Sequence, residues 1–176
     1  MLMAFGVEGL SRLTINGRIK VQVEKGASIR FLGKTRINSG AFFNPIGRNH
    51  RTTLICREGG VLTIGNNVGI SSTAIICHKN VTIGDNVRIG GNVVIYDTDF
   101  HSMSLEERTS SPEVLSNIKK KEVVIEDGVF IGAHSTILKG ARIGENSVIG
   151  AGSVVRGTIP PNQVWMGNPA KYVADL

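Results

Sequence analysis

The sequence predicts an all-β protein, a parallel β-helix whose short strands stack into a three-sided prism. An aliphatic residue returns every six positions, a period that neither a 3.6-residue helix nor a two-residue strand alternation produces. A short fixed repeat indicates units that must stack on their neighbours to bury their apolar faces. Twenty-two glycines among 176 residues suit short strands joined by tight corners. The period is unbroken through Ile125, Ile131, Ile137, Ile143, Ile149 and Val155.

Three hexapeptides per coil place equivalent residues above one another, about 4.8 Å apart as in any β-ladder. A slip of one residue between Ile76 and Ile83 interrupts the spacing once. The predicted inward columns are Ile64, Ile83, Ile125 and Ile143; Ile70, Ile89, Ile131 and Ile149; and Ile76, Ile95, Ile137 and Val155. Four positions after members of these columns, small or β-branched residues should fill the narrow interior: Val68, Val87, Ala74, Val93, Ser135 and Ser153.

We expect one domain over residues 1–176, since this length suffices for one substantial core. Residues 1–60 are less regular and predict a cap with degenerate coils, while residues 61–159 form the regular β-helix. Pro160 and Pro161 stop the ladder because proline has no N–H to donate, so residues 160–176 form a tail folded over the last coil. The irregular part contains the apolar residues Val21, Val23, Ile29, Ile37 and Ile46.

One long insertion interrupts the repeat at residues 97–122. Ile95 and Ile125 are separated by 30 positions where six would serve. A long loop anchored at both ends on a rigid scaffold usually serves binding, catalysis or assembly. A short helix is a further expectation for residues 112–118.

The third residue of the second hexapeptide is small in every coil, namely Ser72, Gly91, Ala133 and Ala151. Tiny side chains allow a ligand to approach the backbone closely. The alternative, that corners of this repeat simply prefer small residues, remains open, although the other two columns are mostly large and polar.

Composition narrows the function classes. The net charge of +6 suggests an anionic partner, but no aromatic interleaving or recognised motif indicates nucleic-acid binding. Cys56 and Cys77 are not close in sequence, and two thiols make no disulfide framework, which fits a reducing cytoplasm. We expect neither a signal peptide nor a membrane span, because no apolar run approaches the roughly 20 residues that a span needs.

Several strings carry a family resemblance. Ile83-Gly84-Asp85-Asn86-Val87, Ile131-Gly132-Ala133 and Ile149-Gly150-Ala151-Gly152-Ser153 resemble the hexapeptide-repeat acyltransferases. Tyr96-Asp97-Thr98-Asp99-Phe100-His101-Ser102 and Trp165-Met166-Gly167-Asn168-Pro169-Ala170-Lys171 look like the galactoside/maltose O-acetyltransferase branch, especially its relatives that acetylate capsular or exopolysaccharide sugars. The resemblance covers residues 60–176. It implies a left-handed helix, a homotrimer, and acetyl-CoA bound between neighbouring prisms.

The resemblance also assigns catalytic roles. His101 matches the family's catalytic histidine, and a neutral imidazole can take the proton of a sugar hydroxyl that attacks a thioester, so no metal is needed. Asp97 and Asp99 alternate with His101 and would share its side in an extended segment. Either carboxylate could orient the imidazole, with turn formation or acceptor binding as alternatives.

For the coenzyme, Ala133 and Ala151 match positions whose main chain lines the pantetheine arm, and the small column adds Gly91. The N–H of Ala133 is a candidate oxyanion donor. Arg156 and Lys171 match positions that the family places near the coenzyme phosphates. Gly157 stands where the family commonly has a lysine, and Lys139 could make that phosphate contact instead. Trp165 could stack on adenine or cap the prism.

Three alternatives compete with a sugar O-acetyltransferase. The acceptor could be an antibiotic or a serine hydroxyl, because related branches share the donor site. The chain could be a non-catalytic β-helix that serves as a scaffold. A zinc enzyme resembling the gamma-class carbonic anhydrases would need converging histidines, whereas His50, His78, His101 and His134 are isolated in sequence.

Overall fold

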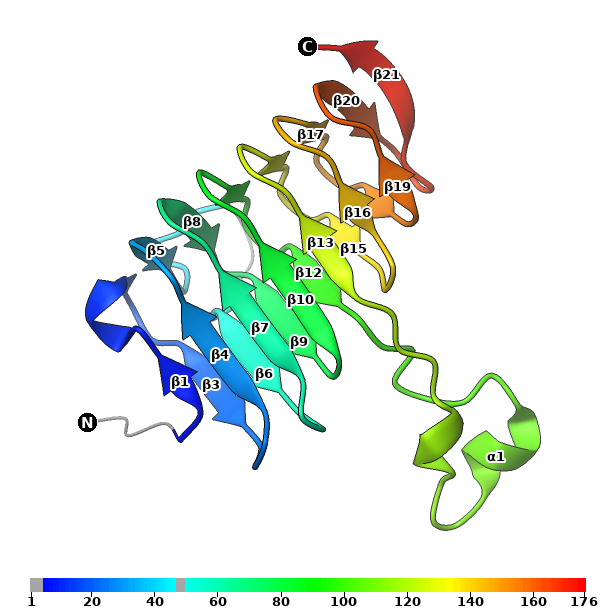
Figure 1. The fold of residues 1–176 in the computed structure, drawn as a ribbon. Coiled ribbons are helices and arrows are strands. Elements are labelled where there is room, and N and C mark those ends of the chain that lie inside the picture. Colours follow the sequence, from blue (N-terminus) through cyan, green and yellow to red (C-terminus); the bar gives the residue numbers. More distant parts are fainter. Residues whose placement is uncertain (1–4, 47–49) are drawn as a thin grey trace.

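A computed structural model describes residues 5–46 and 50–176, and its strands form three sheets along one prism (Figure 1). Within the described residues, sheet A contains β1 (Val7–Glu8), β4 (Ser28–Phe31), β7 (Val61–Ile64), β10 (Asn80–Ile83), β13 (Val123–Ile125), β16 (Arg142–Ile143) and β19 (Thr158–Ile159). Sheet B contains β2 (Leu13–Asn16), β5 (Thr35–Asn38), β8 (Val68–Ser71), β11 (Arg88–Ile89), β14 (Phe130–Ile131), β17 (Val148–Ile149), β20 (Gln163–Met166) and β21 (Lys171–Asp175). Sheet C contains β3 (Lys20–Val23), β6 (Thr53–Cys56), β9 (Ala74–Cys77), β12 (Val94–Tyr96), β15 (Thr136–Ile137) and β18 (Val154–Val155). The chain visits A, B and C in turn, and every pair of strands is parallel except β20 with β21.

The ladders place the first two predicted columns in register. Ile64 pairs with Ile83, Ile83 with Ile125, and Ile125 with Ile143, all on sheet A. The sheet B column, from Ile70 through Ile89 and Ile131 to Ile149, is likewise in register. These isoleucines are at most 2% exposed, so the centre of the prism is a continuous aliphatic core.

The third column requires a correction at its first member. Ile95 pairs with Ile75 and not with Ile76, and Ile75 is fully buried while Ile76 lies on the outer face. Thr73, and not Ala74, fills the interior beside it. The cause is a corner that is one residue shorter than in the coils above. Ser72 has a φ of 43° at this corner and its carbonyl accepts the N–H of Asn92, so it occupies two corner positions at once.

Residues before 60 are more regular than the sequence suggested. Ile29 pairs with Leu62 and Phe31 with Ile64, while Ile37 pairs with Ile70. The six-residue period did not reveal these coils, because residues 39–52 are inserted between β5 and β6 and interrupt it. Ile46 lies in this insertion, 48% exposed, and belongs to no strand.

Cys56 and Cys77, distant in sequence, lie on neighbouring rungs of sheet C. Both are fully buried free thiols. The Cys56 thiol also donates to the carbonyl of Gly60 at 3.0 Å. The hydrogen bond with Cys56, together with burial, raises the pKa of Cys77, so both side chains serve as part of the interior packing.

Candidate functional site

The long insertion leaves the prism after β12 and returns at β13, and it projects from the coils in Figure 1. A short two-stranded stem closes its base. The N–H of Lys121 donates to Asp97 O at 2.9 Å, and the N–H of Asp99 donates to Lys119 O at 3.1 Å. Beyond the stem are the helix α1 (Leu105–Thr109) and a 3₁₀ turn, η2 (Leu115–Asn117). The expected helix at 112–118 is therefore only this turn. The α-helix starts earlier, where the Ser104 hydroxyl accepts the N–H of Glu107.

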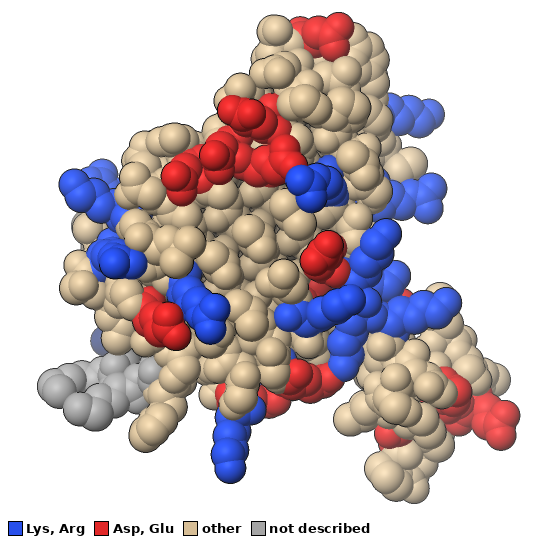
Figure 2. Space-filling view, viewed as in Figure 1, with Lys and Arg blue, Asp and Glu red and all other residues tan. Residues whose placement is uncertain are grey.

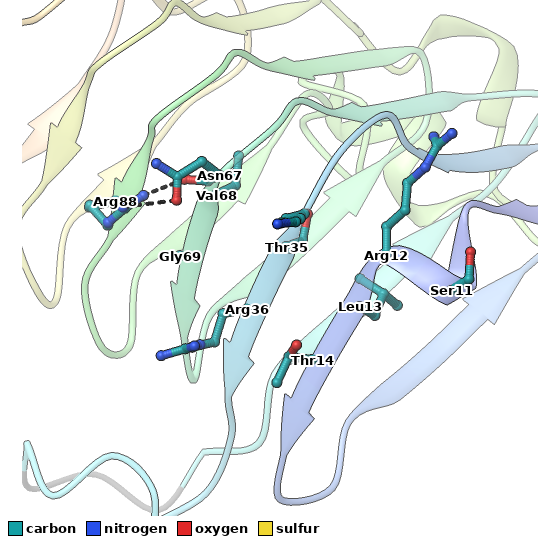
Figure 3. A pocket seen from close by; sticks show the side chains of 11 residues that line it. Ser11, Arg12, Leu13, Thr14, Thr35, Arg36, Asn67, Val68, Gly69 and Arg88 are labelled. Atoms are coloured by element: carbon teal, nitrogen blue, oxygen red, sulfur yellow. Dashed lines mark hydrogen bonds between the residues drawn. The ribbon is translucent and has the colours of Figure 1, made fainter.

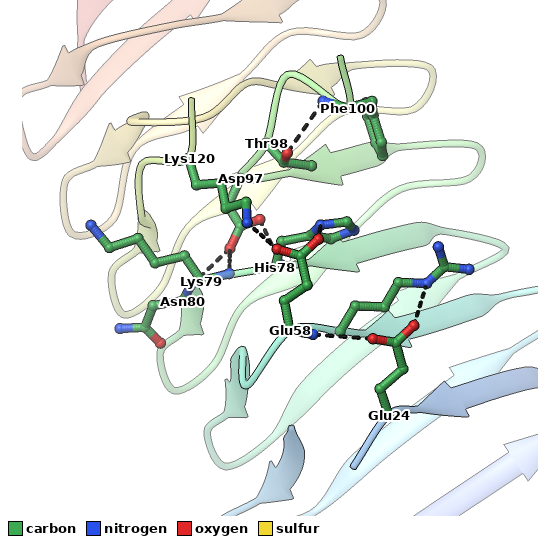
Figure 4. Close-up of polar contacts among 10 residues, drawn as sticks. Glu24, Glu58, His78, Lys79, Asn80, Asp97, Thr98, Phe100 and Lys120 are labelled. Atoms are coloured by element: carbon green, nitrogen blue, oxygen red, sulfur yellow. Dashed lines mark hydrogen bonds and ion pairs between the residues drawn. The ribbon is translucent and has the colours of Figure 1, made fainter. Parts of the chain in front are cut away.

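Asp97 is fully buried beneath the stem and accepts three backbone N–H groups (Figure 4). The donors are His78, Lys79 and Asn80, each at 2.8 Å. This carboxylate therefore closes the corner of the coil below and does not contact His101. Asp99 instead pairs with the ammonium of Lys139 at 3.0 Å. Of the alternatives that the sequence left open, the contacts of Asp97 match turn formation, and in this structure neither aspartate contacts His101.

The carboxylate that contacts His101 belongs to Glu113. The Nδ1 of His101 lies 3.0 Å from Glu113 Oε2. The His101 side chain is 64% exposed and Glu113 only 20%, so the carboxylate is the more fixed partner. Because a carboxylate only accepts, Nδ1 carries the proton in the neutral ring and Nε2 keeps its lone pair. No sequence pattern points to Glu113, since it lies 12 residues away from His101.

A second set of contacts fixes the stem to the coil below. Glu58 accepts from Lys120 and lies 3.0 Å from His78 Nδ1 (Figure 4). The hydrogen bond from Lys120 is the main cause that lowers the pKa of Glu58. Phe100, with a φ of 64°, packs against Tyr96 at 5.2 Å between ring centroids and against His78 at 6.1 Å. The backbone immediately before His101 is thereby held from both sides.

The small-residue column is open at one end and covered at the other. A Cβ on Gly91 would lie 2.4 Å from Ile46 Cγ2 and 2.6 Å from Asn44 Nδ2, so the insertion at 39–52 covers this position. Ala133 is half-buried and Ala151 is exposed. The carbonyl of Ala133 already accepts the N–H of Gly152 at 2.8 Å. The surface open to a ligand thus runs over Ala133 and Ala151.

Sheet B continues past Pro160 and Pro161, because β20 pairs with β17, so the prolines do not stop the ladder as the sequence predicted. At this end of the prism Arg156, directly after β18, and Lys171, at the start of β21, are both exposed. Trp165 pairs with Ile149 in the ladder and packs on the core, while its indole N–H donates to Gln163 at 2.9 Å. Tyr172 packs edge-on against Trp165, with ring centroids 6.4 Å apart. These contacts give Trp165 a role in closing the last coil.

The histidines do not converge in the part of the chain that the structure describes. His78 contacts Glu58, His101 contacts Glu113, and His134 Nδ1 lies 3.1 Å from Asn92. Among residues 5–46 and 50–176, three or more His, Cys, Asp or Glu side chains gather nowhere in a way that could hold a metal ion. Over the same residues, no helix has the length and apolar character needed to cross a membrane.

Comparisons with known proteins agree with this geometry. The bacterial transferase hexapeptide (six repeats) family matches residues 122–157. Galactoside O-acetyltransferase of Escherichia coli K12 is 37% identical over 119 residues, covering 67% of this chain and 56% of that protein. A hexapeptide-repeat acetyltransferase of Vibrio cholerae, solved with acetyl coenzyme A, is 26% identical with a TM-score of 0.59, covering 94% of this chain and 71% of that one.

A maltose O-acetyltransferase of Clostridium difficile 630 is 25% identical with a TM-score of 0.54, covering 94% of this chain and 70% of that one. These likenesses confirm the predicted fold, a left-handed parallel β-helix. The chain spans between 44% and 60% of the length of the first curated relatives that it matches.

Proposed function

The chain belongs to the hexapeptide-repeat transferase family, and on that premise we propose that it is an acetyl-CoA-dependent O-acetyltransferase. Its acceptor would be a hydroxyl of a sugar or polysaccharide precursor. The observation that carries the proposal is His101, held at the root of the insertion by Glu113 at 3.0 Å with Nε2 free. The relative named galactoside O-acetyltransferase supports a sugar acceptor. The neighbour solved with acetyl coenzyme A supports the donor.

His101 acts as the general base in direct transfer. Acetyl-CoA supplies an activated acyl group and a thiolate leaving group. His101 Nε2 accepts the proton of the acceptor hydroxyl as the oxygen attacks, and Glu113 stabilises the resulting imidazolium. The same imidazolium then returns its proton to the departing thiolate, so the enzyme ends unchanged. The N–H of Ala133 is the candidate donor to the developing oxyanion.

The open column fits the coenzyme. Ala133 and Ala151 leave room for a thin, extended arm beside the backbone, and a larger side chain there would fill that space. Arg156 and Lys171 are exposed cations at the same end of the prism, which suits a ligand with several phosphates. Gly91 belongs to this site only if the insertion above it moves, because Ile46 covers it.

We further propose a homotrimer with its active sites between subunits. The outer face of sheet C is mostly apolar along two columns: Ile55, Ile76, Tyr96 and Leu138, beside Ala74, Val94, Thr136 and Val154. Packing this face against other copies would remove it from water, and it would bring another surface towards the exposed His101. Buried, unpaired thiols suit a reducing compartment, so we propose the cytoplasm as the location.

A panel of acceptors tests the function. Sugars, nucleotide sugars, an antibiotic with a free hydroxyl, and serine are each incubated with acetyl-CoA, and acetylated products are detected by mass spectrometry. We expect a sugar-containing product from the natural chain and none from His101→Ala. Acetyl-CoA binding by His101→Ala, measured by calorimetry, should be within a few-fold of the natural chain. Retained turnover in that variant would exclude His101 as the base.

A further inference from the structure

A basic groove lies on the opposite edge of the prism from the apolar face of sheet C. It is a hollow of about 500 Å³ at the corner between sheets A and B. It is lined by the N-terminal coils and by β8 and β11 (Figure 3). The insertion with His101 leaves from the corner between sheets C and A, so the groove is separate from the proposed catalytic site. Its cationic lining residues are Arg12, Lys34, Arg36 and Arg88.

The floor of the groove is shaped by one glycine. On the outer face of sheet B, Arg36 pairs with Gly69 and Gly69 pairs with Arg88. The two backbone positions are therefore two rungs, about 10 Å, apart, and Gly69 contributes no side chain between them. A Cβ on Gly69 would lie 3.0 Å from Arg88 Cδ and 3.6 Å from its Nε, so the Arg88 side chain lies across Gly69. The glycine thus leaves room for the Arg88 guanidinium to lie over sheet B, on the same face as Arg36.

Two of the cations are fixed by hydrogen bonds that leave donors free. Arg12 donates one N–H to Phe31 O at 2.8 Å. Arg88 donates to the carbonyls of Asn67 and Val87 and, at 3.3 Å, to the side-chain oxygen of Asn67. A guanidinium has five N–H donors, so Arg12 retains four of them and Arg88 two. All of these acceptors are neutral, and the positive charge of the groove is not cancelled.

Carboxylates occur further along the same edge but are occupied. Asp85 accepts the N–H of Asn66, and Asp127 accepts the N–H of Asp85, each at 2.7 Å. Figure 2 shows one cluster of Asp and Glu side chains on the drawn face of the prism, with further acidic side chains elsewhere on that face. Among the described residues, the four groove cations form no salt bridge, whereas Arg142, on sheet A, pairs with Glu126.

We propose that this groove binds an extended ligand with two or more anionic groups. Guanidinium groups bind carboxylates and phosphates in a bidentate geometry. Cations spread over about two rungs favour acid groups that are similarly spread, rather than a single small anion. The acid groups could be carboxylates of an acidic oligosaccharide or phosphates of a phosphorylated sugar precursor, which share this chemistry.

Calorimetry with three probes tests the site on the full chain. The probes are trigalacturonate, pyrophosphate and, as the neutral control, maltotriose. We expect one of the two anions to bind and maltotriose not to bind, and the preferred anion identifies the acid group. Arg36→Gln combined with Arg88→Gln should raise the Kd about tenfold or more. Gly69→Val should do the same by filling the floor, since valine is favoured in strands and only the flexible Arg88 side chain must yield.

Arg142→Gln is the matched control, because it removes the same charge from an arginine outside the groove. It should leave the Kd within about twofold of the natural chain at the same ionic strength. His101→Ala should also bind normally, so failure of catalysis and failure of this site remain distinguishable. The proposal is wrong if neither anion binds, if Gly69→Val binds as the natural chain does, or if Arg142→Gln weakens binding as much as the groove variants.

Discussion

The two insertions in this prism differ in how they are held and in what they present. In the first insertion, residues 39–52, the described residues Asn44 and Ile46 lie over Gly91 at the corner between sheets B and C. The insertion at 97–122 projects from the coils and is fixed at its stem by Asp97, Glu58 and Lys120. Hydrogen bonds hold the first insertion at its base, where the N–H of Gly40 donates to Ser72 Oγ at 3.1 Å and the N–H of Thr52 donates to Ser39 Oγ at 2.8 Å. The base of the second is held by an ion pair as well, between Lys120 and Glu58, and this insertion presents the exposed His101.

The largest expected effect concerns the insertion at 97–122, which carries His101 and Glu113. Glu113→Gln keeps the shape of the side chain but removes the charge that stabilises the imidazolium of His101. We expect kcat to fall about 10- to 100-fold, the range for groups that orient a reacting or ligating histidine. The Kd for acetyl-CoA should stay within a few-fold of the natural chain, because Glu113 contacts His101 and not the proposed coenzyme surface. A lower melting temperature with an unchanged kcat would indicate a purely structural role.

The next effect compares the open and covered ends of the small-residue column. Ala133→Trp should raise the Kd for acetyl-CoA about tenfold or more by filling the open surface. Gly91→Ala should leave this Kd nearly unchanged, because the first insertion already covers the position. It should instead lower the melting temperature, since the new Cβ would meet Ile46 at 2.4 Å. Unchanged coenzyme affinity in Ala133→Trp would exclude this surface as the donor site.

Self-association offers a third comparison, between the outer faces of sheets C and A. Ile76→Lys places a charge in the apolar face of sheet C and should shift the chain from trimer to monomer in light scattering. Thr82→Lys, at an outward position on sheet A, should leave the oligomeric state unchanged. A monomeric natural chain, or equal behaviour of both variants, would contradict the proposed interface.

A smaller effect is expected in acid at the stem. The hydrogen bond from Lys120 lowers the pKa of Glu58 in the folded chain. The contribution of Glu58 to stability is therefore complete above the unfolded pKa and is lost as the pH falls through the lower, folded value. Proteolysis of the insertion should therefore accelerate in acid. Glu58→Gln should remove part of that acceleration while cutting faster at neutral pH. Because Glu58 is partly exposed, the change should be modest.

The smallest expected effect concerns the reactivity of the two buried thiols. Cys56 and Cys77 should not react with a water-soluble thiol reagent in the folded chain, because both are buried and the pKa of Cys77 is raised. Both should react once the chain is unfolded in denaturant. Rapid reaction under native conditions would mean that the lower coils open readily.

Periodicity predicted most of the fold because each inward isoleucine is placed by its own repeat. It failed at Ile76, where a shorter corner moved the register, and before residue 60, where an insertion separated Phe31 from Ile64 by 33 positions. In the site, a family resemblance pointed to His101 as the proposed base, and the sequence offered Asp97 and Asp99 as possible orienting groups, with turn formation or acceptor binding as alternatives. The contact with Glu113 depends on how the insertion folds, and no short-range pattern encodes that.

The corner at Ser72 is one residue shorter than the equivalent corners, yet the strands on either side of it keep their pairing. The rungs directly before and after this corner pair normally with the next coil, so a change in length is absorbed locally and is not transmitted along the prism. Corners can therefore gain or lose residues while the packing of the aliphatic core and the register of the strands stay the same. Grafting of foreign loops should succeed at these vertices and fail within the flat faces.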